Sequence, residues 1–331
     1  MPKLFPIAHN LPAAVPLTVA ALVLLLAIAT AVSLELRRRQ PSEAHDNLWL
    51  RVRTWWQMLA VFAAALLLGG VWSLLFFALL SFLALKEYFS LIPTRRADRR
   101  VLFWAYLAIP LQFLWVSWHW YGMFLAFIPV FCFLLLPLRM LSIGETEGYL
   151  KAAGTIQWGL MTTVFCLSHA AFLLILRLPQ EPQRLVGPGL VLFLVLLTEL
   201  NDIAQYLWGR SLGRRPIAPR VSPNKTRAGF VGGVATTLLA GALLGPLLTP
   251  MSLVASLAAG LIIGLGGFAG DLNISAVKRD LGIKDSGSLL PGHGGILDRV
   301  DSLTYTAPLF FHFLYVLQPW QTYAGQVWWR S

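Results

Sequence analysis

The sequence predicts an all-α membrane protein, a polytopic bundle of about ten transmembrane helices with its functional loops on the cytoplasmic side. Its 331 residues are 57% hydrophobic and 12% charged, whereas about 25% of the residues of a typical soluble domain are charged. Apolar runs that are long enough to cross a bilayer, about 20 residues, recur along the chain. Short basic clusters separate these runs, as is typical of cytoplasmic loops.

The first apolar run, residues 13–34, is expected to be a retained span with the N-terminus outside. Its positive charges, Arg37, Arg38 and Arg39, follow the apolar residues, whereas a signal peptide has them in front. Residues 58–89 are too long for one span. Because this basic cluster and the arginines at positions 95, 96, 99 and 100 both favour the cytoplasm, an even number of crossings separates them. We therefore expect a hairpin of two short spans that turns near Gly69 and Gly70.

Seven further apolar runs complete the ten spans. They cover residues 101–118, 121–138, 155–176, 186–207, 229–248, 251–268 and 303–319. Both chain ends then lie outside, and the polar loops 208–228 and 271–301 face the cytoplasm, where we expect the active-site loops. The predicted location is the cytoplasmic (inner) membrane. Lys86 and Glu87 end a span, where a helix-end ion pair or a snorkelling lysine is expected.

Two parts are expected, N-terminal membrane helices in residues 1–184 and a catalytic membrane region in residues 185–331, within one integrated domain. The net charge of +11 comes from loop clusters that suit lipid headgroups and phosphates, so no nucleic-acid partner is expected. The two cysteines, Cys132 and Cys166, lie in apolar runs without CxxC spacing. Neither a disulfide framework nor a thiolate metal site is indicated.

The first polar constellation covers residues 199–233. Asp202 interrupts an apolar run, and a buried carboxylate needs a polar partner, a cation or water. A hydrogen bond between helices is the alternative explanation. Six cations follow with no acidic residue among them: Arg210, Arg214, Arg215, Arg220, Lys225 and Arg227. Three prolines stiffen this loop, and Ser222, Lys225 and Thr226 precede a helix start, an arrangement that suits phosphate better than a plain positive-inside loop.

The second constellation covers residues 270–302. Asp271 ends a span, and Ser275, Lys278 and Arg279 follow at near-helical spacing, so that one helix face can carry a carboxylate and cations. A glycine-containing loop with Lys284 and Asp285 comes next. His293 and two glycines then lead into Asp298, Arg299 and Asp301. The two aspartates are three residues apart and are expected to share a helix face.

A metal–phosphate site explains this mixture of charges. Magnesium commonly binds one or two carboxylates together with substrate phosphates, which makes Asp271, Asp298 and Asp301 the predicted ligands. Compensating ion pairs are the structural alternative. A Walker A loop is absent from the sequence, so a P-loop site is not supported.

These residues resemble the signature of the CDP-diacylglycerol synthase family, the phosphatidate cytidylyltransferases. The matching positions are Ser275, Lys278, Arg279, Lys284, Asp285, Gly287, Pro291, His293, Gly294, Gly295, Asp298, Arg299 and Asp301. At motif level the resemblance runs from about Asn201 to Ser302. Two stretches depart from the family pattern: KTRAG at 225–229 lacks the acidic residue of KTxEG, and NDIAQY at 201–206 lacks a Ser or Thr after the aspartate.

The resemblance implies transfer of a cytidylyl group from CTP to phosphatidate, which yields CDP-diacylglycerol and pyrophosphate in phospholipid biosynthesis. It also implies a magnesium requirement with metal on Asp271 and Asp298, an accompanying monovalent cation such as K⁺, and a homodimer. The alternatives are a CTP-using membrane enzyme that acts on another lipid phosphate or polyprenol, and a lipid- or nucleotide-binding membrane protein without turnover. A transporter is disfavoured because the polar residues crowd into the last part of the chain rather than recurring in two halves.

The expected mechanism is an in-line displacement at the α-phosphorus of CTP. Phosphomonoesters have a second pKa of about 6, so the phosphate of phosphatidate needs no general base. Positioning and charge neutralisation then suffice. In this scheme Asp271, Asp298 and Asp301 hold magnesium, with Asp202 assisting. Lys278, Arg279 and Arg299 neutralise phosphate oxygens, Lys284 and Asp285 shape the loop, and His293 donates to pyrophosphate or orients the glycine turn. The lipid phosphate is bound by Arg220, Ser222, Lys225 and Thr226.

Overall fold

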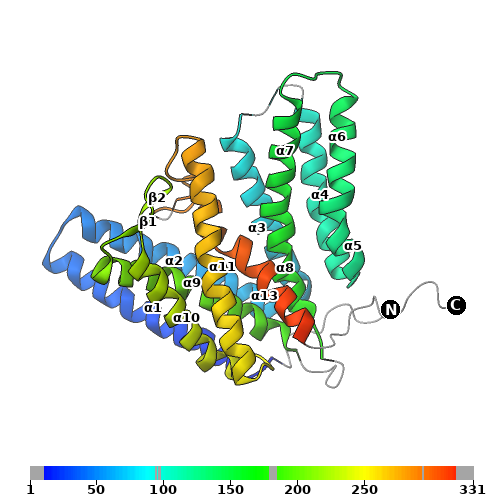
Figure 1. The fold of residues 1–331 in the computed structure, drawn as a ribbon. Coiled ribbons are helices and arrows are strands. Elements are labelled where there is room, and N and C mark those ends of the chain that lie inside the picture. Colours follow the sequence, from blue (N-terminus) through cyan, green and yellow to red (C-terminus); the bar gives the residue numbers. More distant parts are fainter. Residues whose placement is uncertain (1–10, 94, 96–97, 179–184, 293, 318–331) are drawn as a thin grey trace.

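Helices dominate the described residues, and this confirms the predicted all-α class (Figure 1). The computed structural model describes residues 11–93, 95, 98–178, 185–292 and 294–317. Within these residues, strands are limited to β1 (Pro216–Ala218) and β2 (Ser222–Thr226), which pair antiparallel in one small hairpin.

The N-terminal helices include the expected hairpin. They are α1 (Ala14–Arg39), α2 (Glu43–Leu68), α3 (Gly70–Leu91) and α4 (Arg99–Ser117). Gly69 joins α2 to α3 with φ of 64°, a left-handed conformation that glycine adopts without steric cost. α2 begins at Glu43, well before the expected residue 58, because the Ser42 side chain accepts the His45 N–H and caps a polar first half.

Two spans contain a π-helical segment. The first consists of α5 (Tyr121–Ala126), η2 (Phe127–Cys132) and α6 (Phe133–Leu141), and the second of α7 (Tyr149–Leu160), η3 (Met161–Phe165) and α8 (Cys166–Ile175). In the first, η2 contains Pro129, which has no backbone N–H to donate to the α-helical pattern.

The C-terminal helices complete the bundle. They are α9 (Gly187–Leu212), α10 (Arg227–Leu248), α11 (Leu253–Asp280), α12 (Leu297–Val300) and α13 (Leu303–Leu317). Eight helical spans within the described residues are long and apolar enough to cross a membrane. The two expected spans not among them are α2, which starts in polar sequence, and α13, of which 15 residues are described. The chain is an integral membrane protein of the polytopic helical type.

Small residues let α9, α10 and α11 approach closely. A Cβ atom at Gly260 of α11 would lie 2.8 Å from the Thr237 carbonyl of α10, and one at Gly241 would lie 2.8 Å from the Ser256 carbonyl of α11. On the α9 side of α10, a Cβ at Gly229 would lie 2.6 Å from the Gln205 carbonyl. Such close backbone approach is typical of helices that pack in membranes. These three closely packed helices carry or adjoin Asp202, Lys225 and Asp271, and so fix their relative positions.

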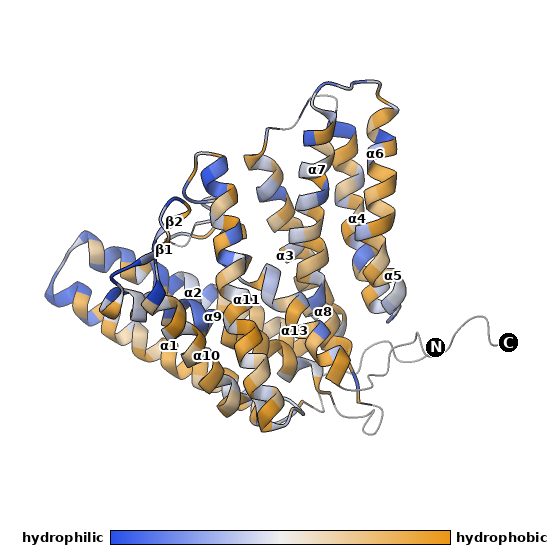
Figure 2. Cartoon of the chain, in the orientation of Figure 1, coloured by the Kyte–Doolittle hydropathy of each residue, from blue (hydrophilic) through white to orange (hydrophobic). Residues whose placement is uncertain are grey.

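Polar segments gather at a few places on an otherwise apolar bundle (Figure 2). They are the turn between α1 and α2, the β1–β2 hairpin, the end of α11 and the connection between α6 and α7. Contacts also join the predicted N-terminal and C-terminal parts, since α13 packs on α8 and α12 packs on α3. The boundary between residues 184 and 185 stays a prediction.

Candidate functional site

The end of α11 carries the first half of the site. Asp271 accepts a hydrogen bond of 3.1 Å from the Ser275 hydroxyl one turn later, and it forms an ion pair with Lys225. The Lys225 ammonium also lies 5.0 Å from the ring centre of Phe268, which adds a cation–π attraction. The two charged side chains are 14% and 28% exposed. The structure therefore joins the two polar constellations of the sequence in one place.

Lys225 reaches α11 because the segment before α10 folds as the β1–β2 hairpin, where the sequence indicated only a stiff loop. Thr226, a predicted substrate contact, accepts the Gly229 N–H at 3.1 Å and so caps the N-terminus of α10. Arg279 of α11 donates to the Val221 carbonyl at 3.1 Å. Contacts to both α10 and α11 thus fix the hairpin beside the site.

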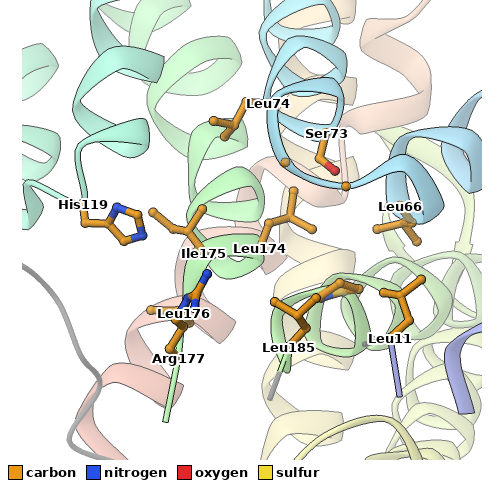
Figure 3. Close-up of a pocket in the computed structure, with 13 residues that line it drawn as sticks. Leu11, Leu66, Ser73, Leu74, His119, Leu174, Ile175, Leu176, Arg177 and Leu185 are labelled. Carbon is orange, nitrogen blue, oxygen red and sulfur yellow. The ribbon is translucent and has the colours of Figure 1, made fainter. Parts of the chain in front are cut away.

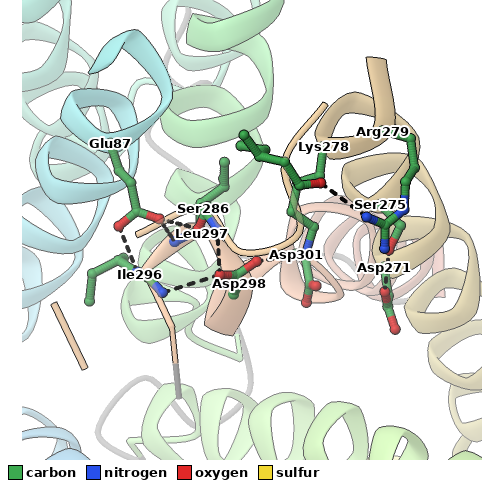
Figure 4. A network of polar contacts seen from close by, with 12 residues as sticks. Glu87, Asp271, Ser275, Lys278, Arg279, Ser286, Ile296, Leu297, Asp298 and Asp301 are labelled. Carbon is green, nitrogen blue, oxygen red and sulfur yellow. Dashed lines mark hydrogen bonds and ion pairs between the residues drawn. The ribbon is translucent and has the colours of Figure 1, made fainter. Parts of the chain in front are cut away.

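Asp298 lies at the centre of a hydrogen-bonded knot (Figure 4). Lys278 of α11 contacts one of its oxygens at 2.6 Å, and the backbone N–H groups of Ser286 and Gly295 donate to the other at 2.8 and 3.1 Å. Burial raises the pKa of Asp298, but these donors outweigh burial and hold its pKa below the ordinary value. Both oxygens are engaged, so Asp298 ties the loop after α11 to α11 itself.

Asp301 faces a different set of groups. Its carboxylate accepts the Ser302 N–H at 2.7 Å, and the Ser302 hydroxyl donates to Asp202 of α9 at 2.9 Å. Burial first, and repulsion from the Asp271 carboxylate second, raise the pKa of Asp301 well above its ordinary value. The second oxygen of Asp202 is buried and has no hydrogen-bond partner among the described residues. Without a bound cation, burial and this repulsion favour the protonated form of Asp301.

The carboxylates of the site could supply part of the ligand set of a magnesium ion. Within the described residues, no three acidic, histidine or cysteine side chains converge tightly enough to hold a metal ion by themselves. Both oxygens of Asp298 already accept hydrogen bonds. The other three carboxylates, Asp202, Asp271 and Asp301, lie close enough to repel one another, and we call them the acidic corner. A hard cation that arrives with phosphate oxygens of its own suits such a set. The three predicted ligands are thus divided between two places.

The remaining predicted residues are exposed, partly buried or outside the described residues. Four of them are exposed: Arg220, Lys284, Asp285 and Arg299. Of these, Arg299 exerts an electrostatic attraction on Asp301. Ser222 is partly buried in β2. His293 lies outside the described residues, as do the last two residues of the span expected at 303–319.

Glu87 of α3 is a site residue that the sequence did not reveal. A helix-end pair of Lys86 and Glu87 was among the expectations, but Glu87 instead accepts the N–H groups of Ile296 and Leu297, at 2.8 and 3.1 Å, and the Ser286 hydroxyl (Figure 4). A carboxylate at the end of an apolar span was the available sign. The sequence offered no way to identify the loop that it binds, more than 190 positions away.

Thr54 of α2 is a second contact from the N-terminal helices. Its hydroxyl donates to the Pro291 carbonyl at 2.8 Å, and a Cβ at the neighbouring Gly292 would lie 3.2 Å from the Arg51 side chain. The loop between α11 and α12 is therefore held by α2 and α3 as well as by α11.

A separate pocket lies at the far end of α3 from Glu87 (Figure 3). Its lining includes Gly69 and Gly70, whereas Glu87 stands 17 residues along the helix from Gly70, or about 25 Å at 1.5 Å per residue. The lining is mostly apolar, with His119 and Arg177 as its ionisable members. None of the carboxylates described above lines this pocket, and we do not assign the site to it.

Comparison with known proteins gives one family. The profile described as the cytidylyltransferase family matches residues 49–317, which contain all of the site residues discussed above.

Curated relatives match over most of their lengths. The protein from Escherichia coli (strain K12) described as uncharacterized protein YnbB is 48% identical over 298 residues, 90% of this chain and 97% of that protein. The phosphatidate cytidylyltransferase of Staphylococcus haemolyticus is 31% identical over 264 residues, 78% of this chain and 97% of that enzyme. The phosphatidate cytidylyltransferase of Staphylococcus saprophyticus is 32% identical with the same coverage.

Proposed function

We propose that this chain, which belongs to the cytidylyltransferase family, transfers a cytidylyl group from CTP to phosphatidate and releases pyrophosphate. The observation that carries the proposal is the partly buried acidic corner of Asp202, Asp271 and Asp301, set beside Lys225 and Lys278. Carboxylates for a metal ion and cations for phosphate oxygens are the groups that phosphoryl-type transfer needs.

Family membership supports cytidylyl transfer from CTP within a membrane, and the relatives named phosphatidate cytidylyltransferase favour phosphatidate as the acceptor. The more similar relative carries no assigned activity. A different lipid phosphate or a polyprenol phosphate is therefore an acceptor that the experiment must include.

Magnesium is part of the proposal. Asp271 and Asp301 would hold it, because these carboxylates repel one another and are not both neutralised by hydrogen bonds, with Asp202 assisting. When bound, magnesium supplies charge neutralisation and orientation for the triphosphate oxygens. A monovalent cation such as K⁺, as in the family resemblance, belongs to the same proposal.

The chain's own residues supply positioning and positive charge. Lys278 is held by Asp298 at the edge of the acidic corner, where its ammonium can neutralise a phosphate oxygen during the displacement. Lys225 stands between the β1–β2 hairpin and α11, and we assign it to the lipid phosphate. The phosphomonoester attacks the α-phosphorus of CTP, the bond to pyrophosphate breaks, and pyrophosphate leaves with the electron pair.

The proposed setting is the cytoplasmic membrane, with the site facing the cytoplasm where CTP is available. The basic clusters at 37–39 and 210–227 support this orientation through the positive-inside rule. A homodimer is proposed from the family resemblance alone.

A single assay tests the proposed function. Purified protein in detergent, incubated with magnesium and radiolabelled CTP, should convert phosphatidate to a labelled lipid and release pyrophosphate. Lysophosphatidate, a polyprenol phosphate and a lipid without a phosphomonoester complete the panel. If only the polyprenol phosphate is labelled, the acceptor is a polyprenol phosphate and not phosphatidate. If no acceptor gives a labelled lipid, the proposed function is refuted.

The substitution Ala228→Glu tests the departure from the family pattern. Ala228 lies in the first turn of α10, which has no acidic residue there, and an acidic side chain near a helix N-terminus is stabilising by about 0.3–1 kcal/mol. We expect faster turnover with phosphatidate and an unchanged or higher unfolding temperature. Ala228→Gln, similar in size and uncharged, is the control. An equal rise in both variants, or none in either, argues against a role for the missing carboxylate.

A further inference from the structure

Glu87 lies at the end of α3, outside both polar constellations of the sequence. We propose that Glu87 is a positioning residue, which holds the loop between α11 and α12 so that Asp298, Asp301 and Lys278 keep their relative places. This role rests on the proposed function insofar as the positioned groups act on substrate. The contacts of Glu87 themselves stand independently of the substrate.

The Glu87 carboxylate binds the loop at two places, at Ser286 and at the start of α12. One oxygen accepts the Ile296 N–H at 2.8 Å, and the other accepts the Leu297 N–H at 3.1 Å together with the Ser286 hydroxyl. Hydrogen bonds to a charged acceptor are about twice as strong as neutral ones. Ser286, inside the loop, and Leu297, the first residue of α12, are thus held to α3 by one side chain.

Ser286 connects Glu87 to the knot around Asp298. Its hydroxyl donates to Glu87, and its backbone N–H donates to Asp298 at 2.8 Å. Asp298 in turn is held by Lys278. A displacement of Glu87 is therefore transmitted to Lys278 through Ser286 and the Asp298 carboxylate.

Two glycines of the loop make room for the Glu87 carboxylate. A Cβ at Gly295 would collide with a Glu87 oxygen and lie 2.5 Å from the Ser286 hydroxyl oxygen, and one at Gly287 would lie 3.1 Å from the Glu87 carboxyl carbon. Neither glycine has a positive φ, unlike Gly292 and Gly294. Space for the carboxylate, rather than backbone conformation, accounts for glycine at these two positions.

Loss of the carboxylate leaves the beginning of α12 without acceptors. The N–H groups of Ile296 and Leu297 then lack their partner, and α12 carries Asp298 one residue later. A misplacement of about 1 Å at a catalytic group can cost about 100-fold in rate. Glu87 therefore affects catalysis through geometry without contact to substrate.

Glu87→Gln is the central variant, because it replaces one carboxylate oxygen by an amide nitrogen, which cannot accept a hydrogen bond. Either the Ile296 N–H, or the Leu297 N–H and the Ser286 hydroxyl, then lose their acceptor. We expect kcat to fall at least about tenfold, with the KM for CTP changed less than about threefold, in protein that remains folded. Glu87→Asp, which keeps both acceptor oxygens, should restore part of kcat. Glu35→Gln, an exposed glutamate paired with Arg39 on α1, is the matched control and should leave kcat unchanged.

Hydrogen–deuterium exchange gives a result that does not depend on turnover. In Glu87→Gln, peptides that cover residues 286–297 should exchange faster, while α10 and the first part of α11 keep their protection. Unchanged exchange in this loop, or an unchanged kcat in folded protein, overturns the positioning role. If Glu87→Gln does not fold, Ser286→Ala removes one donor and should accelerate exchange in the same peptides. Its failure to do so also overturns the proposal.

The two proposals fail in distinguishable ways. Wild-type protein that labels no lipid refutes the proposed function, and exchange then decides alone whether Glu87 holds the loop. In active protein, the double variant Glu87→Gln, Ser286→Ala should lose little more kcat than Glu87→Gln alone, because both changes break the same contact. Full additivity of the two losses would contradict a shared path.

Discussion

Replacement of Asp271 by asparagine is expected to lower the rate of cytidylyl transfer about 10²- to 10³-fold, the usual cost of removing one charge-stabilising group. Asp271 pairs with Lys225 and repels Asp301, so its charge acts on both of these groups. Loss of its negative charge also weakens the proposed magnesium site, and the magnesium concentration for half-maximal rate should rise. The measurement is the initial rate against magnesium at saturating CTP and phosphatidate.

The control for this substitution is on the same helix. Asp280 ends α11 and is exposed, so Asp280→Asn removes one negative charge without touching the corner. Its rate and magnesium dependence should match those of the wild type. A full rate in Asp271→Asn would remove Asp271 from the mechanism, and an equal loss in both variants would indicate a general effect of charge.

Asp298→Asn is expected to lower both turnover and stability. The carboxylate and the Lys278 ammonium are 7% and 12% exposed, and breaking a buried pair by removing one partner typically costs about 3–5 kcal/mol. An amide also lacks one of the acceptor oxygens that bind Lys278 and the loop. We expect a lower unfolding temperature in detergent and a rate, per folded molecule, at least about 100-fold below wild type.

Asp98 offers a matched buried pair outside the site. It is 1% exposed and binds Arg95 at 2.7 Å in the connection between α3 and α4. Asp98→Asn should lower the unfolding temperature as well, yet leave the rate per folded molecule near that of the wild type. If Asp98→Asn and Asp298→Asn reduce this rate equally, the knot at Asp298 has a structural role alone.

Local sequence patterns were sufficient for the class of fold and for several helices. The hairpin at Gly69 and Gly70 and the continuation of α11 through Ser275 and Lys278 were predicted correctly, because apolar length and helical spacing act over a few turns. The early start of α2, the β1–β2 hairpin and the π-helical segments were missed. Each depends on caps and hydrogen bonds that apolar length does not report.

The site residues likewise include some that local spacing predicted and some that it did not. Spacing alone placed Asp271 and Ser275 on one helix face, where they are joined by a hydrogen bond. The assignment of Asp298 and Asp301 to one metal set rested on a shared helix face, but α12 ends at Val300 and the two carboxylates enter different networks. A separation of three residues in sequence does not determine which side chains of distant helices Asp298 and Asp301 will contact.

By itself, the sequence determined that this chain is a polytopic membrane protein and that its C-terminal part carries two charged constellations beside apolar spans, because a bilayer selects long apolar runs and makes charge beside them costly. Only the tertiary structure decided that Lys225 meets Asp271, that Asp298 is occupied by Lys278, and that Glu87 of the N-terminal helices holds the loop between them. These pairings join residues 20 to 209 positions apart. Packing of whole helices against one another sets such distances, and no local pattern encodes them.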